Sequence, residues 1–479
     1  MLTPPRGGFV RQSPYNHPVE VSPGDAAPRI LSRPEHIVSR KDIDPDALKV
    51  LYRLKNHGFV AYLVGGGVRD LLLRRRPKDF DISTSAHPQQ VRKLFRNSFI
   101  VGRRFRLVHV RFGRNVVETA TFRKASEPEA GDTLVRRDNT FGTPEEDAFR
   151  RDFTVNALFY DIANFSVIDW VGGLEDLEAR LIRTIGDPGV RLLEDPVRML
   201  RAVAIAARLD FKIDSDTVEA IRALRGEIVR SSSARILEEF YKILRMGRSR
   251  RTFEMLHEYG LLAYLLPEAD AAIGQGGEAL LGSLSRLDGY RNSGADLEAL
   301  TNPLLTGSLL VPLGVPLRRV PTSIPSWRRR GRKDQPVEDL ASEIASLGGE
   351  EDPEPTDSSG PPPSALPFAR RDLERLRLLL AAQRRLREVD ASASARQALA
   401  TKTYFDDALR WMEIHGGPEG HELATRWRRM PRKADESARD VGPARDEPRS
   451  PPGNEPKSPP RKRRRRRRRR PGASNTARA

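Results

Sequence analysis

Residues 59–82 read FVAYLVGGGVRDLLLRRRPKDFDI, and this stretch decides the fold that we expect. The apolar run at 59–64 predicts a short buried strand, and Gly65, Gly66 and Gly67 predict a tight turn into a helix. Glycine lets the backbone approach a ligand, and the free N–H groups at a helix start attract anions, so the turn is typical of a phosphate cradle. A turn that needs glycine for its geometry alone stays open as the alternative.

Two carboxylates, Asp79 and Asp81, close this stretch. Residues two apart in a strand point to the same face, so both should project together while Phe80 and Ile82 pack into the core. Adjacent carboxylates repel each other, which favours a bound cation, and magnesium suits oxygen ligands that bridge to phosphates. A turn with two solvated acids is the other interpretation, and the cradle just upstream weighs against it.

A third carboxylate for such a site has two candidates. Asp152 lies in RRDFTVNA, residues 150–157, and Glu118 lies on the strand-like run 116–122. A surface ion pair with the neighbouring arginines would also account for Asp152. Only geometry can choose between the two candidates.

The sequence EDPVRMLR, residues 194–201, opens a helical part of the chain. Asp before Pro predicts a helix start, with Asp195 as N-cap and Pro196 as the first helical residue. Arg198 and Arg201 lie three apart, on one face of that helix. The acceptor Asp195 and the donors Arg198 and Arg201 at one helix end indicate a site that recognises the edge of a nucleobase and binds its triphosphate. This role can coexist with capping.

The composition points to a polyanionic partner. The 479 residues include 83 Lys and Arg against 65 Asp and Glu, a formal charge of +18, and positions 461–470 are all basic. Nucleic acid is the favoured polyanion and an anionic membrane the alternative. The absence of cysteine excludes disulfides and thiolate metal sites. Prolines interrupt the uncharged stretch 299–317, and no apolar leader follows Met1, so we expect no membrane span and a cytoplasmic protein.

The periodicity predicts an α+β protein, in which a head with a small mixed sheet precedes an all-helical neck and body. Pro- and Gly-rich or highly charged stretches mark the linkers. The predicted parts are a flexible lead (1–40), the head (41–191), the neck (192–266), a helical body (267–430) with an irregular insertion at about 318–365, and a disordered arginine-rich tail (431–479).

Four motifs occur in the order found in class II nucleotidyltransferases, a branch of the polymerase beta-like superfamily, and the chain resembles that family over residues 35–265. The family comprises CCA-adding tRNA nucleotidyltransferases and bacterial poly(A) polymerases. Segments 91–97, 101–110, 138–142 and 145–148, with the basic tail, look like the poly(A) polymerases. The four motifs are Gly66-Gly67-Val68-Arg69-Asp70, Lys78-Asp79-Phe80-Asp81, Arg150-Arg151-Asp152-Phe153-Thr154 and Glu194-Asp195-x-x-Arg198.

This resemblance implies the roles of individual residues. Asp79 and Asp81 would hold two Mg²⁺ ions, and Asp152 would complete the catalytic set. Neck residues Arg235, Glu239 and Lys242 look like a motif that braces the nucleotide pocket, whereas Ala204 departs from the usual basic residue. The residues implied in nucleotide binding are Gly66, Arg69, Arg151, Asp195, Arg198 and Arg201.

The resemblance also implies an activity: addition of AMP from ATP to RNA 3′ ends without a template, with release of pyrophosphate, in mRNA polyadenylation and RNA turnover. The expected partners are RNA 3′ ends, ATP and RNA-turnover proteins, and the expected state is a monomer. A CCA-adding enzyme is the alternative within the family. A catalytically inactive RNA-binding protein is the alternative outside enzymes, although Asp79, Asp81 and Asp152 are all present.

Overall fold

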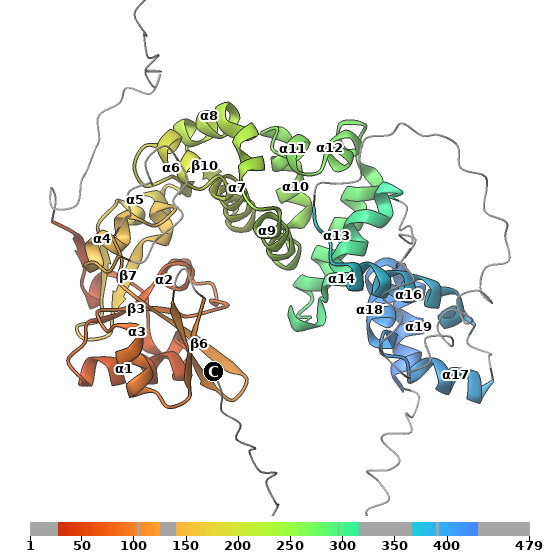
Figure 1. Ribbon diagram of the computed structural model, residues 1–479, viewed down its shortest axis with the longest axis horizontal. Coiled ribbons are helices and arrows are strands. Elements are labelled where there is room, and N and C mark those ends of the chain that lie inside the picture. Colours follow the sequence, from red (N-terminus) through yellow and green to blue (C-terminus); the bar gives the residue numbers. More distant parts are fainter. Residues whose placement is uncertain are drawn as a thin grey trace, which may run out of the picture. The chain divides into compact units, whose positions relative to one another are not determined.

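The computed structural model describes residues 27–102, 106–124, 140–295, 297–315, 366–388 and 392–429 (Figure 1). The predicted insertion at 318–365, the basic tail at 431–479 and most of the predicted lead lie outside the described residues.

The head is built on a mixed sheet of eight strands in the order β1-β8-β7-β2-β3-β6-β5-β4. β3 and β6 are parallel, and the other neighbouring strands in this sheet are antiparallel. The predicted buried strand at 59–64 is β2, which lies in the middle of the sheet. The strands are β1 Arg29–Leu31, β2 Ala61–Val64, β3 Asp81–Thr84, β4 Ser98–Val101, β5 Leu107–Phe112, β6 Asn115–Thr121, β7 Leu158–Asp161 and β8 Ser166–Asp169.

Two helices, α1 (Pro45–Asn56) and α3 (Pro88–Leu94), pack against strands of this sheet. Asp44 caps α1 through hydrogen bonds that its Oδ1 accepts from Asp46 N and Ala47 N. Apolar side chains at helical spacing on α1 are buried, and so are the inward residues of β3, β5 and β6. The opposite side chains of those three strands face away from this core.

The start of regular structure differs from the prediction of a flexible lead to residue 40. Arg29 pairs with Asp169, so β1 forms one edge of the sheet. His36 Nε2 also lies 2.8 Å from Phe165 O. A strand of three residues is too short to show a period of two in the sequence, and only its pairing with β8 holds it.

The rest of the described chain is mainly helical, as predicted, with one exception inside the neck: β10 (Lys212–Ile213) pairs in parallel with β9 (Leu181–Ile182). The helices not yet named are α2 Gly66–Leu72, α4 Pro144–Phe149, α5 Gly173–Glu178, α6 Pro188–Glu194, α7 Val197–Leu209, α8 Ser215–Leu224, α9 Ser233–Arg245, α10 Ser249–Glu258, α11 Leu262–Leu265, α12 Pro267–Gly274, α13 Glu278–Asn292, α14 Asn302–Leu310, α16 Arg370–Arg387, α17 Ala393–Ala400, α18 Phe405–His415 and α19 Gly417–Arg429.

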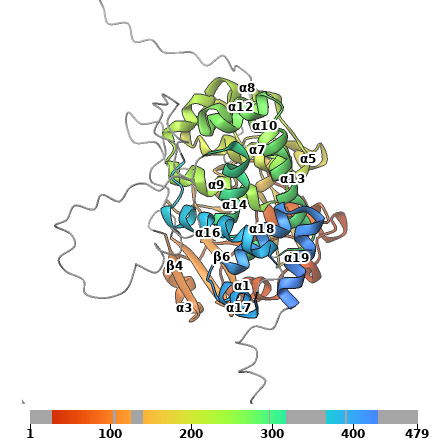
Figure 2. The ribbon, with the colours of Figure 1, turned by 90° about the vertical axis from the view of Figure 1, so that its right-hand side faces the viewer.

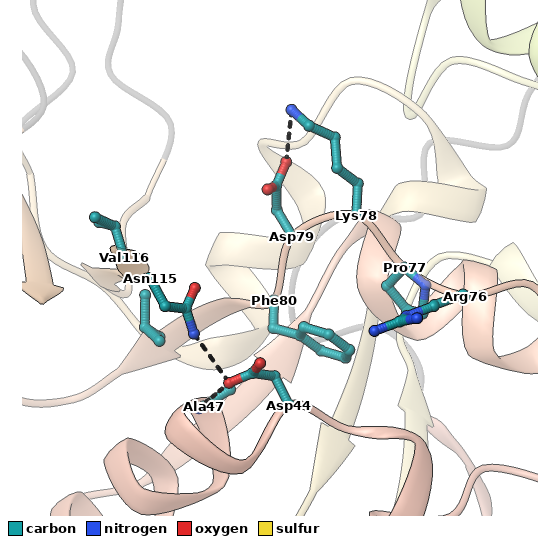
Figure 3. Close-up of a pocket in the computed structure, with 10 residues that line it drawn as sticks. Asp44, Ala47, Arg76, Pro77, Lys78, Asp79, Phe80, Asn115 and Val116 are labelled. Atoms are coloured by element: carbon teal, nitrogen blue, oxygen red, sulfur yellow. Dashed lines mark hydrogen bonds and ion pairs between the residues drawn. The ribbon is translucent and has the colours of Figure 1, made fainter. Parts of the chain in front are cut away.

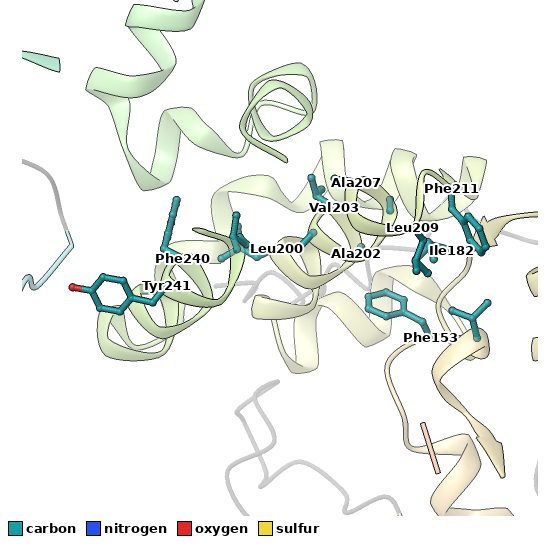
Figure 4. Close-up of a cluster of buried hydrophobic side chains, with 14 of the residues drawn as sticks. Phe153, Ile182, Leu200, Ala202, Val203, Ala207, Leu209, Phe211, Phe240 and Tyr241 are labelled. Carbon is teal, nitrogen blue, oxygen red and sulfur yellow. The ribbon is translucent and has the colours of Figure 1, made fainter. Parts of the chain in front are cut away.

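A buried apolar cluster centred on α7 joins the head to the neck (Figure 4). Phe153 and Ile182 belong to the head, Leu200 and Val203 to α7, and Phe240 to α9. All of them are almost fully buried. This packing holds the helical residues of 194–201 beside the head.

None of the helices that the structure describes is both long and apolar enough to cross a membrane.

His415 on α18 is a partly buried titratable group in the helical body. Its Nε2 lies 2.9 Å from Ser308 Oγ, and its ring stacks beside Trp411. Burial, and then the positive charge of Arg286, lowers the pKa of His415 from 6.5 to about 3. The folded protein therefore lacks a proton that the unfolded chain binds below pH 6.5.

The contribution of neutral His415 to the free energy of unfolding should thus be fully present above pH 6.5 and should be lost as the pH falls toward 3. Between pH 6.5 and about 5, we expect the wild type to lose roughly 1.5 kcal/mol of unfolding free energy more than His415→Gln does. Urea unfolding at both pH values measures this difference, with the exposed His57→Gln as control. Equal losses in wild type and His415→Gln would contradict it.

Candidate active site

The glycine turn lies against two segments that are distant in sequence. Gly65 has φ 72°, and a Cβ there would lie 3.1 Å from Arg151 Nη1. A Cβ at Gly67 would lie 3.3 Å from Asp79 O. Glycine is therefore required by positive φ at one position and by close approach at another. The turn, the Asp79 loop and Arg151 form one wall of the site.

Arg69 points into the protein. Its side chain is 4% exposed, and its Nη2 donates to Asp70 Oδ1 at 2.7 Å. Its Nη1 donates to Asn156 Oδ1. Arg208 of α7 pairs with the other oxygen of Asp70 at 2.6 Å. The buried Asp70 carboxylate thus joins the helix after the turn to the neck.

The two predicted carboxylates lie at the start of β3, but only Asp81 is in the strand. β3 begins at Asp81, which pairs with Val64, and Asp79 lies in the preceding loop. The Asp79 side chain is 66% exposed, and Lys78 Nζ is 3.2 Å from its Oδ2. Phe80 and Ile82 pack into the core, as predicted. The expectation that one strand carries both carboxylates is therefore wrong, because pairing with β2 ends at Asp81.

Glu118 is the carboxylate that the fold brings to Asp81. The parallel register of β3 and β6 pairs Ile82 with Thr119, so Asp81 and Glu118 are neighbours on the same face. Asp81 is exposed, yet desolvation by the protein atoms around its carboxyl, then repulsion from Glu118, raises its pKa to about 6. Asp79 also raises it, and Arg151 opposes the rise. The negative charges of Asp79 and Glu118 therefore both act on Asp81 at this end of β3.

Such a set of charges suits a cation. In the described part of the chain, no three acidic, His or Cys side chains lie close enough together to hold an ion. A metal at Asp79 and Asp81 would therefore need further oxygen ligands, and substrate phosphates provide them.

Asp152 lies apart from this cluster. Its carboxylate is buried, accepts from Phe153 N at 2.9 Å and pairs with Arg201 Nη2 at 2.9 Å. Burial opposes ionisation, but Arg201, Asn156 and Arg198 outweigh it, so the pKa of Asp152 lies below its usual value. Asp152 therefore faces the arginines of α7.

Asp195 connects α6 and α7, and it does not cap α7. The helix begins at Val197 with Pro196 in the cap position and no side-chain cap. Arg235 of α9 instead donates to Asp195 Oδ2 at 2.9 Å. Asp195 Oδ1 is buried and has no hydrogen-bond partner among the described residues. The predicted cap is wrong because a charged partner from another helix attracts this carboxylate.

Arg198 is held by α6, since its Nη1 donates to Arg191 O at 2.6 Å and to Glu194 Oε2 at 3.0 Å. Arg191 Nη2 in turn donates to the carbonyls of Arg150 and Arg151. Arg198 and Arg201 both act electrostatically on Asp152, and Asp195 acts on Arg201. Residues 150–152 connect these groups to the carboxylate cluster.

Asp147 is a site residue that our sequence reasoning missed. Its side chain is 1% exposed and pairs with Arg151 Nη2 at 2.9 Å and with Arg150 Nε at 3.0 Å. The Arg151 guanidinium also lies 5.0 Å from the centre of the Phe159 ring. The available signal was that Arg150 and Arg151 follow Asp147 by three and four residues at the end of α4.

A pocket of about 140 Å³ lies beside Asp79 (Figure 3). Arg76, Lys78 and Asp79 from the loop before β3, Asp44 at the start of α1, and Asn115 at the start of β6 are among its lining residues. Asn115 Nδ2 donates to Asp44 Oδ1 at 3.2 Å. Pockets for small molecules have volumes of about 300–1,000 Å³, so this one is too small to enclose a nucleotide.

Comparisons with known proteins agree with this geometry. Residues 61–183 match the family described as "Poly A polymerase head domain", and residues 210–273 match "Probable RNA and SrmB- binding site of polymerase A". The CCA-adding enzyme of Bacillus stearothermophilus, solved in complex with CTP, shares the fold. It has a TM-score of 0.53 and 27% identity, covering 81% of this chain and 82% of that one.

Three curated relatives show how similarity is distributed. Poly(A) polymerase I of Salmonella typhi is 49% identical over 261 residues, 53% of this chain and 56% of that protein. Poly(A) polymerase I of Escherichia coli O157:H7 is 51% identical over 247 residues, 50% and 53% of the two chains. The CCA-adding enzyme of Lactobacillus helveticus is 41% identical over 217 residues, 45% and 53%.

The chain spans about half the length of the curated relatives it matches. In its sheet and in residues 61–183 and 210–273, the chain is similar to the class II nucleotidyltransferase family. Within that family it is more similar to proteins named poly(A) polymerase I than to the CCA-adding enzymes, which are more distant relatives.

Proposed function

We propose that this protein is a poly(A) polymerase, which adds AMP from ATP to RNA 3′ ends without a template and releases pyrophosphate. The observation that carries the proposal is the group of three carboxylates, Asp79, Asp81 and Glu118, at one end of β3 beside the glycine turn. About 50% identity to poly(A) polymerase I over half the chain supports the choice of reaction. The charge of +18 supports RNA as the acceptor.

Asp79 and Asp81 would hold two magnesium ions. Desolvation, then repulsion from Glu118 and from Asp79, raises the pKa of Asp81, so a cation bound there would relieve a cost that the folded chain carries. Magnesium held by these two carboxylates would supply positive charge that favours ionisation of the RNA 3′-hydroxyl and offsets the charge of the departing pyrophosphate.

Arg151 would face the triphosphate, together with backbone N–H groups of the turn at Gly66. Asp147 holds the Arg151 guanidinium from one side and Phe159 supports it from another, so its charge stays beside Gly65. Arg69 is already paired with Asp70, and its contribution to nucleotide binding would be to hold the turn.

Glu118 would share the catalytic role, because it is the carboxylate next to Asp81. Asp152 would act on the nucleotide side by orienting Arg201. The two candidates for the third carboxylate thus receive different roles.

Asp195 and Arg198 would read the base. The buried Asp195 Oδ1 is an acceptor that no residue in the described part of the chain pairs with, and the adenine amino group at N6 is a donor that suits it. Guanine presents an acceptor, O6, in the corresponding place. A carboxylate there favours ATP and rejects GTP.

Asp195→Asn should therefore relax the preference for ATP over GTP by about tenfold, because an amide can donate to O6 as well as accept from N6. The ratio of kcat/KM for the two nucleotides measures this preference. Asp216→Asn, an exposed residue of the neck, is the control. An unchanged ratio in Asp195→Asn would leave Asp195 as the partner of Arg235 and nothing more.

One experiment tests the proposed function as a whole. The purified protein is incubated with an unrelated RNA or with a tRNA lacking its terminal CCA, each with ATP or CTP and magnesium. We expect long adenylate tails on both RNAs with ATP and little extension with CTP. Addition of C and A to the tRNA alone would identify a CCA-adding enzyme, and RNA binding without any extension would identify an inactive RNA-binding protein.

A further inference from the structure

A row of four side chains crosses the head sheet from the carboxylates to its edge. Phe99 on β4 pairs with His109 on β5, His109 pairs with Glu118 on β6, and Glu118 neighbours Asp81 on β3. The strands that carry Phe99 and Glu118, β4 and β6, are labelled in Figure 2. Paired residues on adjacent strands point to the same face, so the four side chains form one continuous row.

The outer half of this row consists of two rings, the exposed Phe99 and the partly buried His109. Phe99 is 44% exposed. The Phe99 and His109 rings meet edge to face with their centres 5.4 Å apart. His109 Nε2 lies 3.4 Å from Glu118 Oε1, so this contact restrains the imidazole ring. Neighbouring strands are about 5 Å apart, which places His109 about 10 Å from Asp81.

Arg111 is the next residue on the same face of β5, and it is exposed. An aromatic surface with a cation beside it is the combination that holds unpaired nucleotides, since bases stack on rings while phosphates contact arginine. The position of the rings, in line with Asp81 and Glu118, decides which nucleotide is involved. The nucleotide whose 3′-hydroxyl reacts must have its base close to the carboxylates.

We propose that Phe99 and His109 form a stacking platform for the 3′-terminal base of the RNA acceptor. This inference rests on the proposed function and adds to it the binding site of the second substrate. Stacking depends little on the identity of the base, because every base has a π-face. The platform therefore accepts any RNA 3′ end, and it accepts the adenosine that each addition leaves there.

The test uses the full-length protein and an RNA whose last base is 2-aminopurine, without nucleotide or magnesium. Stacking quenches the fluorescence of this base, so binding to wild type should quench it. Phe99→Ala should abolish the quenching that binding to wild type causes, and it should weaken RNA binding about tenfold. Phe99→Trp should retain both. Phe141→Ala is the matched control, because Phe141 is also an exposed ring that meets a histidine, His87, edge to face.

A second RNA with an abasic 3′ end makes the measurement a thermodynamic cycle. Wild type should bind the abasic RNA about tenfold more weakly than the intact RNA, and Phe99→Ala should bind both equally. If the missing base lowers RNA affinity by the same factor in wild type and in Phe99→Ala, the platform is refuted. Full quenching in Phe99→Ala would also refute it and would assign this surface to another partner, such as a protein.

These binding measurements do not depend on AMP transfer. Quenching that depends on Phe99 in a protein without polymerase activity would keep the platform and refute the proposed reaction. Polymerase activity together with an RNA affinity that does not depend on the terminal base would keep the proposed reaction and refute the platform.

Discussion

Asp79→Ala and Asp81→Ala should each lower the rate of AMP addition by about a thousandfold, because the magnesium ions that the two carboxylates would hold contribute several kcal/mol to the transition state. The fold should stay intact. Asp79 is largely exposed in a loop and Asp81 is exposed at the start of β3, so neither substitution removes a buried side chain.

Single-turnover extension of a labelled RNA with ATP and magnesium measures the rate, and circular dichroism with a thermal melt measures the fold. Asp42→Ala, an exposed carboxylate elsewhere in the head, should keep the wild-type rate. A rate within tenfold of wild type for a folded Asp79→Ala or Asp81→Ala would remove these residues from the metal site.

Asp70→Ala should lower the free energy of unfolding by about 3–5 kcal/mol, because it leaves the buried Arg69 guanidinium without its ion partner. Arg208 of the neck loses its partner in the same variant. The effect is large because Arg69 and Asp70 are 4% and 3% exposed, so water cannot replace the lost interaction.

Urea unfolding of wild type and Asp70→Ala measures this difference. The control is Glu175→Ala, which removes the exposed partner of Arg29 and should cost less than about 1 kcal/mol. A loss for Asp70→Ala no larger than for Glu175→Ala would show that Arg69 finds another partner or reaches water.

Much of the head could be predicted from local sequence. The strand at 61–64, the glycine turn and the carboxylates of 79–81 are encoded within a few residues of one another, where period and residue type carry the signal. Asp147 was recoverable too, since its partners Arg150 and Arg151 follow at helical spacing.

The partners of the site residues were not recoverable in this way. Asp195 followed by proline has the local pattern of a cap, yet Arg235, forty positions away, takes its carboxylate. Arg69 has the local pattern of a phosphate ligand, yet its guanidinium donates hydrogen bonds to Asp70 and Asn156. The partner of Asp195 is a distant charge, whereas Arg69 pairs with the adjacent Asp70 and with the distant amide of Asn156.

The sequence by itself determined which residue types stand at the turn, at Asp79 and Asp81 and along the buried stripes of the helices. These depend on contacts between near neighbours in the chain. Only the tertiary structure decided that Glu118 lies beside Asp81, that Asp152 pairs with Arg201, and that the Phe99 and His109 rings continue the carboxylate row. The reason is that strand order and register bring these groups together, and a shift of one residue in register would turn each side chain to the opposite face of the sheet.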